Sequence, residues 1–492
     1  MLFAAGCSVG SLEARRGEPA AAAPPLAATP EPLPAPSSVA ESLVEQPPAF
    51  DVPAPALVAT DTADLAVELG WPPPSDELEK AQSAARARVL GVAKVTEPAE
   101  HGARPPPPLG QLVRIENEER LEHFHSALAR LGRGEAPDGK VRILAYGASH
   151  TQADFYTGYL RTYLQQRFGD GGRGFVLIGR VNAWHRTLDT KARQRHMQVH
   201  HARSRLGTDA EPLGLFGAAL VGNSGDAYAE VTFAPSSPNT EFELAYLAQP
   251  GGGTLKLSLD GVPIGRLPTR AQAPSPGYYR FSAPAGAHTI RVRLLGDGPV
   301  RLYGLIAEAR SPGVVLDTLG IGGARFVDSL RWQNDAWSEA MRHRAPDLVT
   351  FAYGTNEAFD DGLSLGRYAN GVREVLTRLR QAVPEASCLL VAPFDLPNDV
   401  RPRLVDVLAV QRELARELGC GFWDGYTFMG GAGTIHTWAS AKPPFATHDL
   451  VHLTRLGYAR VGEALAAGLM RRYDLERSAP QGVSVGALDP SR

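Results

Sequence analysis

Two patterns of hydrophobic and polar positions alternate in residues 111–205 and again in residues 312–475. Short apolar runs, typical of buried parallel strands, are followed by stretches whose apolar residues recur every three or four positions, as in amphipathic helices. Strands that alternate with helices predict a parallel sheet with helices on both faces. The expected strands are 143–146, 314–319, 347–353, 387–392 and 420–423. The expected helices are 115–131, 155–168, 328–342, 365–382, 403–418 and 454–473.

Between these two parts, residues 206–311 have a different pattern. Apolar and polar residues alternate strictly in short runs, and glycine-rich turns separate the runs. Short strands of period two with frequent turns predict a β-sandwich, inserted here into the α/β domain. Its expected strands are 228–233, 241–246, 254–259, 278–281 and 288–294.

The two ends of the chain do not show either pattern. Residues 1–110 hold roughly half of the 40 prolines and are rich in alanine, so they predict a disordered, extended spacer. Residues 476–492 are expected to form a disordered tail. Ala4-Ala5-Gly6-Cys7 resembles the end of a bacterial lipoprotein signal, which predicts a lipid anchor at Cys7 and an extracytoplasmic location in the periplasm or at the outer membrane. Only six residues precede Cys7, so the alternatives are a start site placed too late and a chance match.

Composition excludes several classes of protein. The net charge of −3 offers no basic field for nucleic acid, and three cysteines are too few for a disulfide scaffold. Cys388 and Cys420 each open an expected strand. They form a bridge if those strands are neighbours, and are otherwise two buried free thiols; the sequence leaves both alternatives open.

Ser149 is the first candidate for chemistry. It follows the strand 143–146 and the turn residue Gly147, just before an amphipathic helix. A serine held between a strand and a helix start is well placed to be a nucleophile, because free N–H groups there can stabilise an oxyanion. The alternative is a serine that only caps a helix.

Partners for Ser149 lie after later strands. Asp449 and His452 are three residues apart before the last helix, so the carboxylate can orient the imidazole toward Ser149. The N–H groups of Ser149 and Gly323 and the side-chain amide of Asn356 are the expected oxyanion donors. His150 is a poorer candidate for the base, because an adjacent side chain points elsewhere.

Other motifs carry less weight. Gly169–Gly174 matches a dinucleotide-binding motif but follows a helix rather than a strand. His196 and His200 are four apart, but no carboxylate or cysteine is close in the sequence, so residues 185–205 predict a solvated basic loop. No metal or cofactor is expected. Thr151 replaces the last glycine of the G-x-S-x-G elbow of α/β-hydrolases.

The ordered blocks resemble those of the SGNH, or GDSL-type, esterases. The matching residues are Ser149, Gly323, Asn356, Asp449 and His452. The resemblance implies a flavodoxin-like three-layer α/β/α fold and a serine esterase. The sequence around these residues is similar to that of the periplasmic peptidoglycan O-acetylesterases. Those enzymes also carry a carbohydrate-binding-like β-sandwich between the first two blocks. The implied substrate is an acetylated glycan polymer. The similar segments are Gly147-Ala-Ser-His-Thr-Gln-Ala-Asp-Phe155, Asp317-Thr-Leu-Gly-Ile-Gly-Gly-Ala-Arg325 and Tyr353-Gly-Thr-Asn-Glu357.

Three positions depart from the family pattern. Ala148 stands where the family has aspartate, Gly322 where this branch often has asparagine, and Glu357 where the wider family has aspartate. Two other functions remain open. One is a GDSL-type lipase or thioesterase, and the other is a non-catalytic glycan-binding protein on an esterase scaffold.

Overall fold

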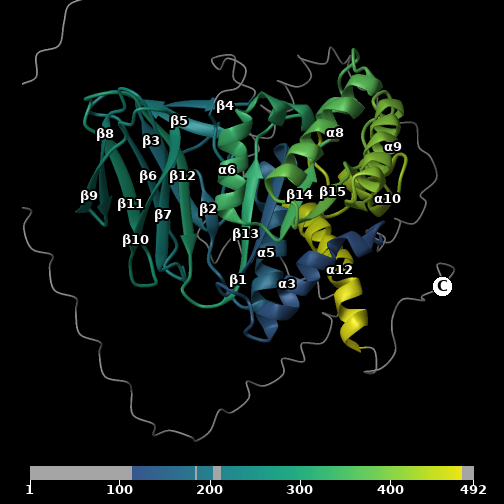
Figure 1. The fold of residues 1–492 in the computed structure, drawn as a ribbon. Helices are drawn as coiled ribbons and strands as arrows, with labels where there is room; N and C mark the ends of the chain where they lie inside the picture. Colours follow the sequence, from purple (N-terminus) through teal and green to yellow (C-terminus); the bar gives the residue numbers. More distant parts are fainter. Residues whose placement is uncertain (1–112, 183–184, 203–211, 479–492) are drawn as a thin grey trace, which may run out of the picture. The chain divides into compact units, whose positions relative to one another are not determined.

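The computed structural model describes residues 113–182, 185–202 and 212–478. The expected spacer, the tail and Cys7 lie outside these residues. Two kinds of sheet are present: a parallel sheet sandwiched by helices, and two antiparallel sheets encoded between its first and second strands (Figure 1).

The parallel sheet has five strands in the order β13-β1-β14-β15-β16. Counted along the chain within this sheet, the order is 2-1-3-4-5, which is the flavodoxin-like arrangement and confirms the predicted α/β fold class. The strands are β1 (Lys140–Gly147), β13 (Gly313–Gly320), β14 (Leu348–Ala352), β15 (Ser387–Val391) and β16 (Gly421–Trp423).

Helices cover both faces of this sheet. Along β1, Leu144 and Tyr146 face one apolar cluster, and Ile143 and Ala145 face the other, so each strand buries both of its faces. One cluster includes α3 (Glu122–Gly132), α5 (Phe155–Phe168), α10 (Gly425–Met429), α11 (Thr434–Ser440) and α12 (Arg455–Ser478); the other includes α6 (Asn334–Arg344), α8 (Leu365–Ala382) and α9 (Arg401–Glu417). Two 3₁₀ turns, η1 (Glu118–Leu121) and η2 (Phe326–Arg331), complete this part. No described helix is long and apolar enough to cross a bilayer.

The carboxyl ends of three strands are aligned at one edge of the sheet. Gly147 of β1 is in register with Gly320 of β13 and Ala352 of β14. Short helices α4 (Ser149–Gln152) and α7 (Thr355–Ala358) start just beyond this edge. A Cβ atom at Gly147 would lie 2.0 Å from Thr151 Oγ1, so only glycine allows α4 to fold back so closely.

The antiparallel sheets form the inserted sandwich. One sheet has the order β10-β7-β12-β5-β4, with β2 paired to β12, and the other has the order β3-β6-β11-β8-β9. Alternating residues of both sheets enter one apolar cluster, as the period-two pattern predicts. The strands are β2 (Gly174–Val176), β3 (Thr190–Arg195), β4 (Gln198–His201), β5 (Ala218–Gly222), β6 (Tyr228–Phe233), β7 (Glu241–Ala248), β8 (Thr254–Leu259), β9 (Val262–Pro268), β10 (Ser275–Ser282), β11 (Thr289–Leu294) and β12 (Val300–Glu308).

The sandwich sheets begin earlier in the sequence than residue 206. Strands β2, β3 and β4 belong to them, although residues up to 205 were expected in the hydrolase domain and 185–205 as a loop. The physical reason is position: β3 and β4 are edge strands, and their arginine and histidine side chains lie on partly solvated faces. Charged edge strands of this kind read as loops in sequence.

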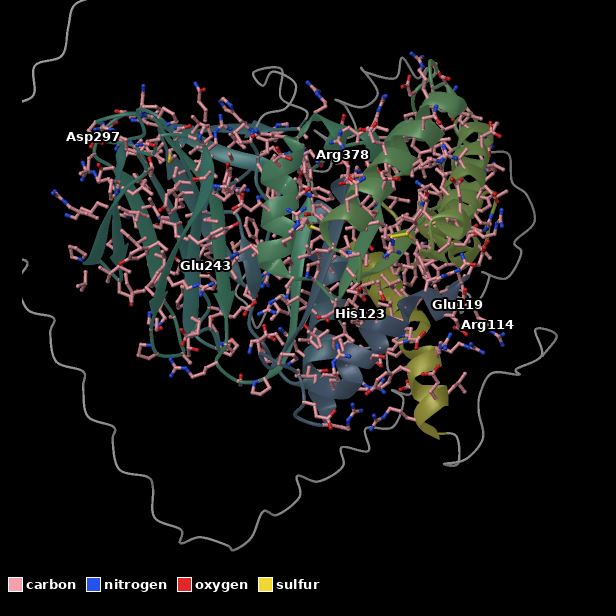
Figure 2. All side chains as sticks on the ribbon, in the orientation of Figure 1. Arg114, Glu119, His123, Glu243, Asp297 and Arg378 are labelled. Atoms are coloured by element: carbon pink, nitrogen blue, oxygen red, sulfur yellow. A yellow bond between two sulfur atoms is a disulfide. The ribbon has the colours of Figure 1, made fainter. Side chains whose placement is uncertain are left out.

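An ion-pair network joins the sandwich to the parallel sheet. Arg344 of α6 donates to the buried Asp317 of β13 (2.6 and 3.0 Å) and also to Glu308 of β12. Arg142 of β1 pairs with the same Glu308 at 3.0 Å. At the same junction, Glu243 of β7, labelled in Figure 2, pairs with His343 of α6 at 2.5 Å. Separating the sandwich from the parallel sheet would leave these charges without their partners, and an unpaired buried charge is unfavourable.

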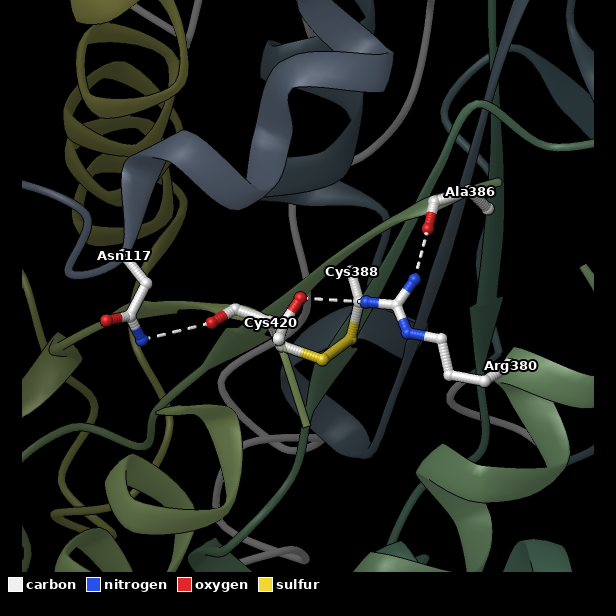
Figure 3. The surroundings of a disulfide bond; sticks show 6 residues. Asn117, Arg380, Ala386, Cys388 and Cys420 are labelled. Carbon is white, nitrogen blue, oxygen red and sulfur yellow. Dashed lines mark hydrogen bonds between the residues drawn. A yellow bond between two sulfur atoms is a disulfide. The ribbon is translucent and has the colours of Figure 1, made fainter. Parts of the chain in front are cut away.

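A disulfide joins Cys388 and Cys420, the residues at the starts of the neighbouring strands β15 and β16 (Figure 3). Strand pairing brings their Cα atoms to 4.6 Å, which resolves the alternative left open by the sequence. Arg380 of α8 donates to the carbonyls of Ala386 and Gly419 on either side, at 2.7 and 2.8 Å. At the amino-terminal edge of the sheet, Arg380 therefore connects the backbone segments that lead into the two bridged cysteines.

We expect removal of this bridge to destabilise the fold. The disulfide spans a sequence separation of 32, which corresponds to about 3 to 4 kcal/mol of unfolding free energy in the loop-entropy description. The measurement is urea unfolding of a Cys388→Ala/Cys420→Ala double variant beside the oxidised parent protein. Equal midpoints would contradict a stabilising bridge, and reduction of the parent with a thiol should reproduce the shift of the variant.

Candidate active site

Ser149, His452 and Asp449 form a continuous hydrogen-bonded chain. His452 Nε2 lies 2.8 Å from Ser149 Oγ, and His452 Nδ1 lies 2.6 Å from Asp449 Oδ2. Ser149 is the first residue of α4 beyond β1, and the other two residues precede α12. Three residues predicted from separate parts of the sequence thus meet in the arrangement of a nucleophile, a base and an orienting carboxylate.

A tight turn holds the carboxylate of Asp449. Its Oδ1 accepts from the backbone N–H groups of Val451 and His452 at 2.9 and 2.8 Å, and from Thr447 Oγ1 at 2.7 Å. Leu450, within the turn, has a φ of 56°, which is costly for a residue with a Cβ atom. Burial raises the pKa of Asp449, but the hydrogen bond and charge of His452 outweigh it and hold the pKa well below its usual range. The carboxylate therefore stays ionised opposite His452.

His150 has a structural position beside this chain. Its Nδ1 lies 2.8 Å from the hydroxyl of Tyr458, and its ring meets the ring of Phe394 edge to face. Its ring centroid is 5.4 Å from that of His452. His150 is buried and packs beside His452, as expected for a residue that points away from Ser149 Oγ.

The expected oxyanion donors follow β13 and β14. Gly323 has a φ of 75° in a turn closed by Ala324 N–H and the carbonyl of Ile321 at 3.0 Å, a conformation that favours glycine. The Asn356 amide donates to the Ala324 carbonyl at 2.9 Å. An amide nitrogen carries two hydrogens, so Asn356 fixes this turn with one and retains the other.

Gln152 was not singled out in the sequence, yet it connects three segments of the site. Its Oε1 accepts from the N–H of Gly322 at 2.5 Å, and its amide exchanges hydrogen bonds with Asn182 at 3.2 and 3.3 Å. A Cβ atom at Gly322 would lie 2.8 Å from Gln152 Oε1. The glycine at this departure from the family pattern therefore fits a loop that is held by Gln152.

Glu357 joins the segment after β13, which carries Gly323, to the segment after β14, which carries Asn356. Its buried carboxyl accepts from the N–H of Phe326 at 2.7 Å and from the N–H of Gly354 at 3.0 Å. Burial raises its pKa to about 7, against the lowering effect of these hydrogen bonds. In the sequence, Glu357 stood out only as a departure from the family pattern. Its two partners, Phe326 and Gly354, lie 31 and 3 residues away, and the contact with the distant Phe326 exists only in the folded chain.

Asp154 is a second carboxylate that the sequence pattern did not assign a role. It is fully buried at the start of α5 and accepts from Arg161 at 3.2 Å, Arg173 at 3.0 Å and Thr318 Oγ1 at 2.6 Å. Burial raises its pKa, but the two arginines outweigh it and lower the pKa well below the usual range. The carboxylate is thus a permanent anion that holds α5, the segment before β2, and β13 together.

Two cavities lined by described residues do not include Ser149, Asp449 or His452. One of about 400 Å³ lies at the ion-pair network, and one of about 370 Å³ lies between α5 and the loop after β6. Trp438 is buried in the apolar cluster under α10 and α11, as core packing predicts. His196 pairs with Asp226 at 2.7 Å, and no group of three metal-ligating side chains exists within the described ranges.

Residues 292–460 match the GDSL-like Lipase/Acylhydrolase family. This part of the chain, about a third of its length, is therefore similar to GDSL-type hydrolases. The match includes Gly323, Asn356, Asp449 and His452, and it begins after Ser149. Ser149 nevertheless lies in the same sheet-edge site, because β1 pairs with both β13 and β14. The family is one of ester hydrolases and acylhydrolases, so the domain is of that class.

Three solved structures are similar to this chain to different degrees. A peptidoglycan O-acetylesterase is similar at 25% identity and a TM-score of 0.58, covering 73% of this chain and 97% of that one. A family two carbohydrate esterase from Cellvibrio japonicus aligns at 13% identity and a TM-score of 0.24, covering 58% and 99%. A putative GDSL-like lipase from Parabacteroides merdae aligns at 20% and 0.26, covering 33% and 74%. Only the first of these three alignments bears on the fold. No curated protein matches the sequence.

The raised pKa of Glu357 predicts a pH-dependent stability. Above its unfolded pKa of 4.5 the unfolded chain loses this proton, whereas the folded protein keeps it until about pH 7. The free energy of unfolding should therefore fall by about 3 kcal/mol across that window, at about 1.4 kcal/mol per pH unit. Glu357→Gln, which cannot ionise, should lose this part of the slope in urea unfolding between about pH 5 and about pH 7.5. Identical slopes would mean that Glu357 is ionised in the folded protein throughout.

Proposed function

We propose that this protein is a serine esterase that removes O-acetyl groups from peptidoglycan. The observation that carries the proposal is the chain from Ser149 Oγ through His452 to Asp449 at the carboxyl edge of the sheet. Its support for the substrate is the similarity to a peptidoglycan O-acetylesterase that extends over 97% of that protein's chain. The reaction needs no cofactor.

The first half of the reaction acylates the enzyme. His452 Nε2 takes the proton of Ser149 Oγ as this oxygen attacks the acetyl carbonyl carbon, and Asp449 stabilises the resulting imidazolium. The N–H groups of Ser149 and Gly323 and the amide of Asn356 donate to the oxyanion of the tetrahedral intermediate. The C–O bond to the sugar then breaks, and His452 returns the proton to the sugar oxygen.

The second half restores Ser149. His452 removes a proton from a water molecule, which attacks the acetyl-enzyme carbonyl. The new tetrahedral intermediate uses the same oxyanion donors and collapses with release of acetate, while His452 returns its proton to Ser149 Oγ. The low pKa of Asp449 keeps a negative charge opposite His452 in both halves.

We place the protein outside the cytoplasm. The disulfide between Cys388 and Cys420 supports this location, because reducing compartments keep such thiols free. The lipid anchor at Cys7 remains a proposal that lies outside the described residues. A membrane-attached esterase at the end of an extended spacer would reach a cell-wall polymer.

The inserted sandwich is proposed to hold the glycan near Ser149. It leaves the parallel sheet between β1 and β13, whose carboxyl ends both carry site residues. A binding module at that point raises the local concentration of a long polymer and has little effect on a small ester. A GDSL-type lipase is the rival function, supported by the description of the matching family.

Substitution of the catalytic chain is the direct test. Ser149→Ala and His452→Ala should each abolish acetate release, and Asp449→Asn should retain more activity because His452 and the oxyanion donors remain. The assay measures release of acetate from O-acetylated peptidoglycan, acetylated xylan and acetylated exopolysaccharide, and of fatty acid from long-chain esters. Ser126→Ala, at an exposed position of α3 outside the sandwich, is the matched control and should keep the parent rate.

Substantial turnover by purified Ser149→Ala would refute the assignment. Preference for long acyl chains over acetyl would favour the lipase alternative. A fluorophosphonate probe should label the parent protein and the Ser126→Ala control, and should not label Ser149→Ala.

Asn356→Ala should separate transition-state stabilisation from substrate binding. We expect kcat to fall on the order of 10²–10³ with little change in KM, because an oxyanion donor acts mainly in the transition state. The measurement is steady-state kinetics on a soluble acetyl ester. An increase confined to KM would make Asn356 a substrate-binding residue instead.

A further inference from the structure

Three arginines without a function in the mechanism above, Arg180, Arg186 and Arg455, lie on segments that contact residues 152–155, just after Ser149 in the chain. Arg180 and Arg186 belong to the segment between β2 and β3. Asn182, within that segment, exchanges hydrogen bonds with Gln152, the last residue of α4. The segment therefore lies against the short helix that begins with Ser149.

Arg455 belongs to a different element, α12. It is the first residue of α12, three residues after His452. Its guanidinium carbon lies 5.3 Å from the ring centroid of Phe155, and that ring stacks on Tyr458, the hydrogen-bond partner of His150. Arg455 is thus tied by packing to the residues that flank the catalytic histidine.

The charges of these arginines act on one another. Burial lowers the pKa of Arg186, and the charge of Arg180 lowers it further. Burial likewise lowers the pKa of Arg455, with a further contribution from the charge of Arg186. Guanidinium groups remain protonated, so this mutual effect is an electrostatic cost that an anion between them would remove.

The nearby carboxylates are committed elsewhere. Asp449 pairs with His452, and Asp154 with Arg161 and Arg173. Within the described parts of the chain, neither Arg186 nor Arg455 forms an ion pair with a carboxylate. The buried Nε of Arg455 also has no hydrogen-bond acceptor there. Arg455 lies on Phe155, and Leu188, two residues after Arg186, donates its N–H to the adjacent Asp154 at 3.1 Å. Two partly desolvated cations and an unused donor therefore lie on the segments that pack against the start of α5.

We infer that Arg186 and Arg455 bind a carboxylate of the substrate while its acetyl ester lies at Ser149. This inference rests on the proposed esterase function and specifies its substrate as an anionic glycan. Guanidinium groups bind carboxylates through short, charge-assisted hydrogen bonds. Peptidoglycan offers such carboxylates on its peptide stems, whereas neutral acetylated polymers do not.

The test compares one polymer in two charge states. O-acetylated peptidoglycan is used as isolated and after its carboxylates have been coupled to a neutral amine, which leaves the acetyl esters in place. We expect the parent protein to show a KM about tenfold lower on the native polymer, and this preference to shrink at high salt. Arg186→Gln and Arg455→Gln should each remove most of the preference.

Two further variants guard against a merely structural effect. Arg455→Lys keeps the positive charge and should keep most of the preference even where packing on Phe155 is weakened. Arg373→Gln removes an exposed arginine of α8 that pairs with Glu417, and should leave the preference unchanged. Ser149→Ala, assayed in parallel, reports on the esterase assignment alone.

The outcomes separate a failure of the carboxylate site from a failure of the esterase function. Equal KM values of the parent protein on native and amidated polymer would overturn the carboxylate site and leave the esterase function intact. An equal loss by the glutamine variants on both polymers would overturn it as well. No acetate release from either polymer would contradict the peptidoglycan assignment together with the inference, and turnover by Ser149→Ala would refute the serine mechanism.

Discussion

A carboxylate buried at the start of α5 constrains the whole catalytic edge. Asp154 is inaccessible to water, and Arg161, Arg173 and Thr318 donate hydrogen bonds to it, as do Thr157 and the N–H of Leu188. Loss of either arginine would leave part of this buried charge uncompensated, which is destabilising. Because Arg161, Arg173 and Thr318 lie on α5, before β2 and on β13, the carboxylate sets the position of the nucleophile segment relative to the oxyanion segment.

Backbone contacts then define the site at finer scale. Glycines 147 and 320 allow α4 to lie directly on the ends of β1 and β13, since a Cβ atom at either would meet α4 within about 2.2 Å. The left-handed backbone of Leu450 places Asp449 where it accepts from two N–H groups and from His452. Strain at such a position is retained where it orients catalytic groups. Orientation of His452 is therefore set before any substrate binds.

The arrangement of charges gives each part of the site a separate task. Asp449 and Asp154 are anions held by their own partners, and Glu357 is a carboxyl whose buried position favours its protonated form. Arg186 and Arg455 remain as cations whose counter-charge the described residues do not supply. The acetyl group of the proposed substrate is small and uncharged, so in this proposal selection among acetylated polymers comes from such groups outside the hydrogen-bonded chain of Ser149, His452 and Asp449.

The parallel sheet was predictable from the sequence, and so were the three residues of the hydrogen-bonded chain, Ser149, His452 and Asp449. Apolar runs and helical periodicity are local signals, so they can be recognised in the sequence. Because the loops after parallel strands lie at one edge of the sheet, Ser149 and His452 could be predicted to lie close together. Only the tertiary structure decided the roles of Asp154 and Glu357, because their partners come from distant segments. It also decided the Cys388–Cys420 bridge, which required β15 and β16 to be neighbours. Strands β3 and β4 escaped prediction because charged residues on the solvated face of an edge strand conceal its alternation.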